Sequence, residues 1–179
     1  MDGWGMDRRR PPGQMELGSG ELYYLEPGFV CFSRSPVQIR TVLGSCVAVC
    51  LWDRRLHCGG MNHFLYPRAR ERRAATPKHG NAAVTALVRL MDEAGCRRQD
   101  LVAQILGGGR YANGRSTGLG DENVRVARQA LQRRGIRIVS EDTGGLMGRK
   151  VIFDTATGHV AVLKVHRLRG SDWIEFEKT

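Results

Sequence analysis

Apolar residues in the first part of the chain occur in short stretches that alternate with polar residues or run together, which is typical of β-strands. The segment 37–52 has this character and is interrupted once, at Gly44 and Ser45. Within it, both alternating faces of residues 46–51 are apolar, which predicts a central strand covered on both sides. An apolar stretch at 22–32, broken near Pro27, predicts one or two shorter strands before it.

Two later segments repeat their apolar residues at helical spacing. In 81–94 the repeat predicts an amphipathic helix that Gly95 ends, and Asp121 is expected to cap a second helix that ends at Gly135. Further strands are predicted at 100–106, 136–140, 150–153 and 159–165, the last two as a hairpin. Because strands outnumber the two helices, the expected fold is α+β, a layered β-sandwich with two main helices.

The chain of 179 residues fits one domain. Residues 1–20 carry Gly, Pro and an arginine triplet with little periodic apolar content, so we expect a flexible basic tail before a single domain at 21–179. No apolar run approaches the roughly 18 residues of a membrane span, and the amino terminus lacks the order of a secretion signal. Five cysteines without the even spacing of a disulfide framework agree with a reducing compartment. These features predict a cytoplasmic protein without membrane insertion.

The net charge of +10, from 28 basic and 18 acidic residues, favours acidic partners. A nucleic-acid-binding module is one interpretation, and steeply salt-dependent affinity would support it. The arginines are dispersed, however, and no aromatic ladder lies between them to stack bases. We therefore favour a solvated basic surface and expect no nucleic-acid partner.

One cysteine and one histidine are predicted to meet on neighbouring strands. If the strand that ends at Trp52 turns through residues 53–56, Trp52 pairs with His57, and Cys46 then lies directly opposite His63. Directly opposed residues point to the same side with Cβ atoms roughly 4.5–5.5 Å apart, so the imidazole can reach the sulfur.

Such a pair suits a thiol nucleophile with its own base. Only a few per cent of a free cysteine is thiolate at neutral pH, so a partner imidazole supplies the activation. Gly44 and Ser45 before Cys46 let the backbone aim an N–H at a developing oxyanion, and Asn62 is a candidate second donor. The alternative is a buried structural cysteine beside a hydrogen-bonded histidine, and the spacing alone leaves both open.

Metal binding is another chemistry that this region suggests. Five soft ligands fall in a short stretch: Cys46, Cys50, His57, Cys58 and His63. Positions four apart on a strand are about 13 Å from each other, so Cys46 and Cys50 cannot share a tetrahedral zinc ion on an unbroken strand. The glycine-rich stretches 107–109 and 144–145 lack the order of a nucleotide fingerprint and suggest tight turns. We expect neither a metal nor an organic cofactor.

Several blocks of the sequence, in order from residue 28 to residue 165, resemble the CheD family of chemoreceptor glutamine deamidases. The blocks are LGSCVAVC at 43–50, GMNHF at 60–64, ILGG at 105–108, LGDEN at 119–123, EDTGG at 141–145 and GRKV at 148–151. The resemblance implies a cysteine-hydrolase deamidase fold, related to the deamidase domain of a bacterial cytotoxic necrotizing toxin.

The resemblance also implies a cysteine, a histidine and a threonine at the site. Cys46 and His63 match the first two, and Thr41 is the threonine just upstream of the cysteine. Thr41 is five positions from Cys46, so on one straight strand its hydroxyl points to the opposite face unless Gly44 marks a bulge.

The implied reaction converts selected glutamines on the cytoplasmic helices of methyl-accepting chemotaxis receptors to glutamate through a Cys46 thioester. Because such helices are often acidic, the basic surface is expected to speed encounter at low salt. The resemblance implies a second partner, the CheY-phosphate phosphatase CheC. The alternative function is a noncatalytic chemotaxis adaptor that binds receptors or a CheC-type phosphatase.

Overall fold

The computed structural model describes residues 20–110 and 118–168, so the expected tail lies almost entirely outside the described residues. Within these ranges the α+β fold is confirmed, with two sheets and two α-helices. The strands are β1 (Glu21–Tyr24), β2 (Val30–Ser33), β3 (Val37–Leu43), β4 (Val47–Asp53), β5 (Cys58–Phe64), β6 (Leu101–Gly107), β7 (Arg137–Thr143), β8 (Gly148–Asp154) and β9 (Val160–Val165). The helices are α1 (Gly80–Glu93) and α2 (Leu119–Gln132), with short 3-10 turns η1 (Arg72–Ala74) and η2 (Arg98–Asp100).

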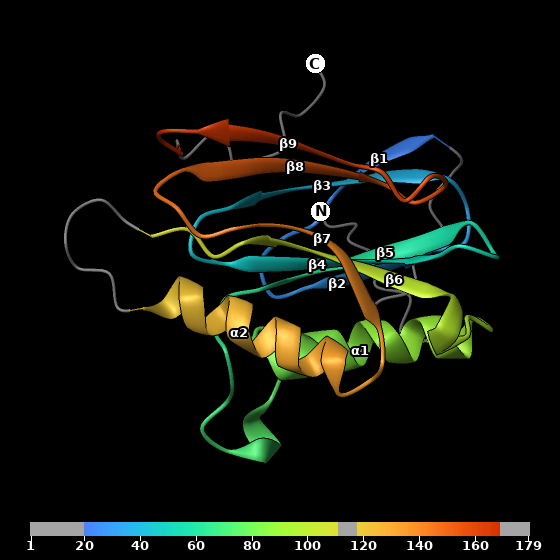
Figure 1. Ribbon diagram of the computed structural model, residues 1–179, viewed down its shortest axis with the longest axis horizontal. Helices are drawn as coiled ribbons and strands as arrows, with labels where there is room; N and C mark the ends of the chain where they lie inside the picture. Colours follow the sequence, from blue (N-terminus) through green and yellow to red (C-terminus); the bar gives the residue numbers. More distant parts are fainter. Residues whose placement is uncertain (1–19, 111–117, 169–179) are drawn as a thin grey trace, which may run out of the picture.

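The elements form three layers. A four-stranded sheet has the order β1-β3-β8-β9, and a five-stranded sheet has the order β2-β5-β4-β6-β7. In Figure 1 the five-stranded sheet is the middle layer, with the other sheet on one side and both helices on the other. None of the described helices has the length and apolar character needed to cross a membrane.

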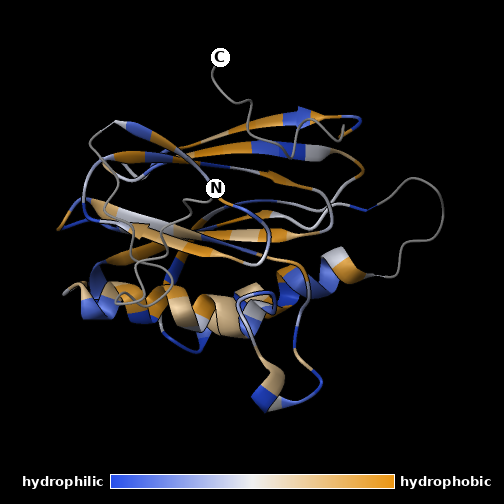
Figure 2. Ribbon diagram, turned by 180° about the vertical axis from the view of Figure 1, so that it is seen from behind, coloured by the Kyte–Doolittle hydropathy of each residue, from blue (hydrophilic) through white to orange (hydrophobic). Residues whose placement is uncertain are grey.

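The central strand β4 has both faces buried, as its sequence predicts. Val47, Val49 and Leu51 pack in the cluster that includes the helices, whereas Ala48 and Cys50 pack in the cluster between the sheets. Figure 2 shows apolar residues along the strands of both sheets, and both helices carry apolar as well as hydrophilic residues.

The segment 37–52 does not form one interrupted strand in one sheet. Its first part is β3 in the four-stranded sheet, and its second part is β4 in the five-stranded sheet. Residues 44–46 cross between the layers. Gly44 and Ser45 therefore mark a change of sheet. Because β3 and β4 belong to different sheets, the alternation of side chains along β4 does not predict which way the side chains of β3 point.

Both helices connect parallel strands of the five-stranded sheet. Since β5 and β6 are each antiparallel to β4, they run in the same direction, and β6 is parallel to β7. As crossovers between parallel strands, α1 and α2 run in the same direction over one face of the sheet (Figure 1).

Helix α1 matches its predicted range closely, but the start of α2 differs from the prediction. Gly118, in the left-handed conformation with φ 68°, is the N-cap, and Asp121 lies in the first turn. Asp121 instead forms an ion pair with Arg110, at 2.9 Å between Oδ1 and Nη2. An acidic residue in the first turn still favours the helix through the helix dipole.

Candidate active site

Residues 44–46 are held by the glycine-rich loop that follows β6. Gly109 N donates to the Gly44 carbonyl oxygen, and Gly108 N donates to the Cys46 carbonyl oxygen, each at 2.8 Å. Gly107 has φ 105°, and a Cβ atom on it would lie 2.2 Å from the Cys46 carbonyl oxygen. Only glycine permits this approach. The stretch 107–109 is thus a close support for the cysteine loop.

The third carbonyl of this loop, that of Ser45, accepts a hydrogen bond from Asn123, a fully buried residue of α2. Its Nδ2 donates to the Ser45 oxygen at 3.1 Å and to the Leu65 oxygen at 2.9 Å, which ties the loop to the end of β5. Sequence reasoning did not single out Asn123, although it lies in one of the family blocks.

These carbonyl bonds also orient the N–H groups of the loop. All peptide bonds of the described residues are trans, so each N–H points away from the carbonyl of the same peptide unit. The N–H groups of Ser45 and Cys46 therefore point away from Gly109 and Asn123. Within the described ranges they donate to no backbone carbonyl.

The pairing of β4 with β5 differs by two residues from the predicted register. Trp52 pairs with Gly59, and Ala48 pairs with His63. Cys46, which lies just before β4, is diagonal to His63 and not directly opposite it. Because side chains alternate with a period of two, the even shift leaves the Cys46 position on the face that carries His63.

The prediction of a turn at 53–56 was wrong because the Asp53 side chain shapes a different turn. Asp53 remains in β4 and pairs with Cys58. Its Oδ1 accepts hydrogen bonds from the N–H groups of Arg55 and Leu56, both at 2.8 Å. His57 takes a left-handed conformation with φ 51° and completes the turn.

Thr41 faces His63 from the opposite sheet. Its Oγ1 lies 2.8 Å from His63 Nδ1 and donates to the Leu25 carbonyl oxygen at 2.7 Å. The single hydroxyl hydrogen is used by the carbonyl, so Oγ1 must accept the Nδ1 hydrogen of His63. The neutral ring then carries its lone pair on Nε2, which is buried and has no hydrogen-bond partner among the described residues.

Burial keeps both groups neutral at pH 7. It raises the pKa of the Cys46 thiol to about 11, although the Cys46 backbone N–H acts in the opposite direction. It lowers the pKa of His63 to about 4, against the effect of the Leu25 carbonyl. The resting pair is therefore a thiol and a neutral imidazole, and the imidazole is in the form that accepts a proton.

The structure does not bring Asn62 to the face of β5 that carries His63. The two residues are adjacent on the strand, so their side chains leave on opposite sides of the sheet. Asn62 Oδ1 accepts a hydrogen bond from Val49 N at 3.0 Å, and its Nδ2 is buried without a partner among the described residues.

A cavity of about 330 Å³ lies beside the cysteine loop. Gly44, Ser45 and Gly109 form one part of its wall. The other described residues of the wall come from the loop after β6, the start of β8 and the segment after β9: Arg110, Leu146, Met147, Gly148, His166, Arg167 and Leu168. Sequence reasoning missed this wall, because its parts are distant along the chain.

The described residues contain no group of three or more His, Cys, Asp or Glu side chains placed to hold a metal ion. In that part of the chain the five cysteines are free thiols, of which Cys46 is half-buried and the other four are buried.

The family described as CheD chemotactic sensory transduction matches residues 66–164 of this chain. A relative from Sulfurimonas denitrificans is 37% identical over 150 residues, which cover 82% of this chain and 96% of the relative. The chain belongs to the CheD family.

This CheD-family chain is also 41% identical over 140 residues to a relative from Trichlorobacter lovleyi, covering 77% of this chain and 87% of that protein. Both relatives carry the name "Probable chemoreceptor glutamine deamidase CheD". Among solved structures, the Bacillus licheniformis hypothetical protein YfiH aligns with a TM-score of 0.44 and 16% identity, over 63% of this chain and 49% of that one. The family match and the two named relatives confirm the resemblance read from the sequence blocks at the level of the family.

Proposed function

We propose that this CheD-family chain is a protein-glutamine deamidase that converts glutamine side chains of chemoreceptors to glutamate. The observation that carries the proposal is the state of His63. Its ring is neutral and its Nδ1 hydrogen is bound to Thr41. Its Nε2 is buried and has no hydrogen-bond partner within the described part of the chain. The names of the relatives supply the class of substrate.

The first step is nucleophilic attack by Cys46. His63 Nε2 takes the thiol proton as the sulfur bonds to the carboxamide carbon, because the thiol is not ionised beforehand. Thr41 acts as a positioning residue, since its acceptance of the Nδ1 hydrogen fixes the tautomer and is retained when the ring becomes charged.

The attack produces a tetrahedral oxyanion. The N–H groups of Ser45 and Cys46 are the proposed donors to it, supported by the orientation that the bound carbonyls of Gly44 and Ser45 give them. Removal of one such donor in other enzymes costs about 10²–10³ in rate, so accurate placement of this loop matters.

Collapse of the tetrahedral species breaks the C–N bond. The imidazolium form of His63 donates its proton to the leaving nitrogen, which departs as ammonia, and a thioester with Cys46 remains. A water molecule deprotonated by His63 then attacks the thioester, which releases glutamate and restores the thiol. The two half-reactions together consume one water and need no other reactant.

The cavity beside Gly44 and Ser45 is the proposed route by which the glutamine side chain reaches the sulfur. The charge of Arg167 in its wall suits an approach by acidic receptor helices. We therefore expect the deamidation rate to fall as the salt concentration rises.

The cellular location of the protein and its second binding partner are also proposals. We infer a cytoplasmic protein, because the resemblance places its substrates on cytoplasmic receptor helices, and a CheC-type phosphatase as the second partner. Co-purification of a CheC-type protein with the purified chain is the measurement that tests the partner.

The deciding experiment uses the purified protein, its Cys46→Ala variant and a receptor cytoplasmic fragment. Mass spectrometry of the fragment should show a gain of about 1 Da per converted glutamine with the unchanged protein only, as expected for an amide-to-acid exchange through Cys46. Cys50→Ala is the matched control, because Cys50 is a buried cysteine that packs between the same two sheets. It should retain activity.

Two outcomes would reject the proposal. Equal gain with the protein and with Cys46→Ala would exclude Cys46 as the nucleophile. Receptor binding without any mass gain, under conditions in which a related deamidase converts the same fragment, would favour the noncatalytic adaptor.

A further inference from the structure

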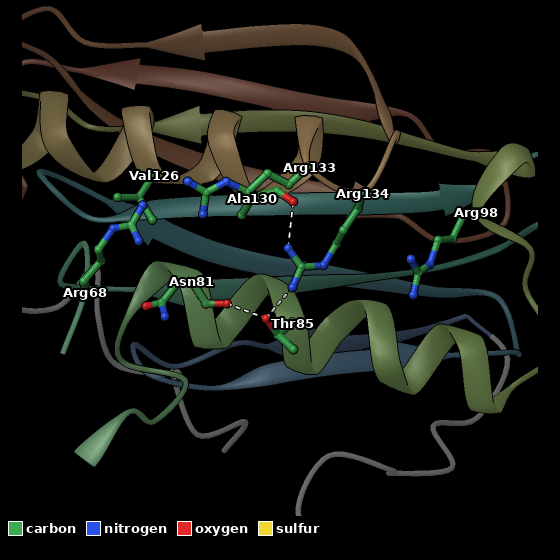
Figure 3. Close-up of a pocket in the computed structure, with 8 residues that line it drawn as sticks. All are labelled: Arg68, Asn81, Thr85, Arg98, Val126, Ala130, Arg133 and Arg134. Carbon is green, nitrogen blue, oxygen red and sulfur yellow. Dashed lines mark hydrogen bonds between the residues drawn. The ribbon is translucent and has the colours of Figure 1, made fainter. Parts of the chain in front are cut away.

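A second cavity, of about 490 Å³, lies between the two helices on the face of the five-stranded sheet away from the cysteine loop. Eight of the described residues line it: Arg68, Asn81, Thr85, Arg98, Val126, Ala130, Arg133 and Arg134. Figure 3 shows Arg134, just after the end of α2, reaching towards Thr85 on α1, with Arg68 and Arg98 on either side of it in this view. Four arginines from three parts of the fold thus line one cavity: Arg68 after β5, Arg98 in η2, and Arg133 with Arg134 at the end of α2.

The positive charge of this cavity is poorly balanced. None of its eight lining residues carries a carboxylate. Among the described residues, only Arg98 of the four arginines forms an ion pair, with Asp92 at 3.5 Å. Glu122 and Asp92 act on Arg68 and Arg134 at longer range, without an ion pair. Arg68 is bonded to the neutral amide oxygen of Gln129 at 2.9 Å, and Arg133 has no described acidic partner. The cavity therefore carries a net positive charge in the absence of a ligand.

Arg134 is held in a fixed position at the base of this cluster. Its Nη1 donates to the Ala130 carbonyl oxygen at 2.7 Å, and its Nη2 donates to Thr85 Oγ1 at 2.6 Å. Burial and the nearby charges of Arg98 and Arg133 lower the pKa of its guanidinium and outweigh the opposing effect of Asp92. A cation held among like charges is stabilised when an anion arrives, which gives the cavity an energetic preference for anionic ligands.

The Asn81 side chain and the first turn of α1 also favour an anion in this cavity. Asn81 Oδ1 is buried with no partner among the described residues, and a half-turn of this amide would present its N–H₂ group at that place. Asn81 also lies in the first turn of α1, which contains no acidic residue, so the helix dipole adds positive potential there.

We propose that this cavity binds a small phosphorylated molecule through its phosphoryl group, with Arg133 and Arg98 contacting the phosphoryl oxygens above Arg134. The planar fork of arginine matches the oxygens of a phosphoryl group. A volume of about 490 Å³ suits a small molecule. Val126 and Ala130 supply too little apolar wall to anchor a peptide helix, so charge and hydrogen bonds carry the affinity.

The test is isothermal titration of the full chain with inorganic pyrophosphate at low salt. We expect saturable binding at one site, weakened roughly tenfold in Arg133→Gln, which removes one charge-assisted contact. The matched control is Arg89→Gln, because Arg89 is an α1 arginine paired with Glu93 and lies outside the cavity. It removes the same charge and should leave the affinity within about twofold.

Arg133 is exposed, and its only described hydrogen bond is made by its backbone N–H to the Gln129 carbonyl oxygen. Replacement of its side chain should therefore not disturb folding, and circular dichroism of each variant checks this. Cys46→Ala should bind pyrophosphate as tightly as the unchanged chain, which separates this site from the proposed deamidase site. Absence of saturable binding, equal weakening by Arg89→Gln and Arg133→Gln, or binding of polyglutamate in preference to pyrophosphate would each overturn the proposal.

Discussion

Acidification should destabilise this protein through His63 before most carboxylates titrate. The ring is fully buried, and its pKa is lowered to about 4 from the ordinary value of 6.5. Between these two values the unfolded chain binds a proton at His63 that the folded chain does not bind. The contribution of His63 to the free energy of unfolding is therefore fully present above pH 6.5 and is lost as the pH drops towards 4.

The size of this loss follows from the two pKa values. At about 1.4 kcal/mol per pKa unit, the lowering from 6.5 to about 4 corresponds to ~3 kcal/mol in total. By the same relation, ~2 kcal/mol of it is lost between pH 7 and pH 5. A domain of this size has about 5–15 kcal/mol of stability in all, so the change is easily measured.

The assay is urea unfolding at pH 7, 6 and 5 for the protein and for His63→Asn. The variant removes the titrating ring and retains an amide N–H that can donate to Thr41 Oγ1. It will be less stable at pH 7, because it leaves a cavity, but its stability should depend less on pH.

The decisive quantity is the difference between the two proteins in the free energy lost from pH 7 to pH 5. The unchanged protein should lose ~2 kcal/mol more than the variant, since all other titrating groups are common to both. Parallel losses would show that His63 titrates normally in the folded state, and the inferred neutral, Thr41-bound ring would then be refuted.

Three further predictions concern the same site. Thr41→Val should cost ~1–3 kcal/mol and most of the deamidase activity, because it leaves buried polar groups unpaired, whereas Thr41→Ser should retain both; urea unfolding and the mass assay measure this. Gly107→Ala should disrupt the cysteine loop and abolish activity. Gly135 also has a positive φ, but a Cβ atom there would meet no other atom, so the control Gly135→Ala should lower only the melting temperature. Iodoacetamide should alkylate Cys46 slowly at pH 7 and progressively faster up to about pH 11, and a rate already maximal at pH 7 would contradict the raised thiol pKa.

Local patterns in the sequence were sufficient to predict several elements. The doubly apolar stretch after Cys46 predicted a central covered strand, and the helical spacing in 81–94 predicted α1, because each pattern depends on which faces of one element are buried. The sequence also predicted correctly that the Cys46 and His63 positions lie on the same face of the sheet. The predicted β4–β5 register was wrong by two residues, and a shift by an even number leaves each side chain on its face.

Other features depended on contacts that no local pattern contains. The assignment of β3 and β4 to different sheets decided that Thr41 reaches His63, and the Asp53 side chain decided the turn that sets the β4–β5 register. The four-arginine cavity arises because two helices in the same direction bring together residues from 68 to 134. Periodicity reports the burial of a single element, whereas the partners of that element are chosen by the packing of the whole chain, so only the tertiary structure shows which polar groups meet.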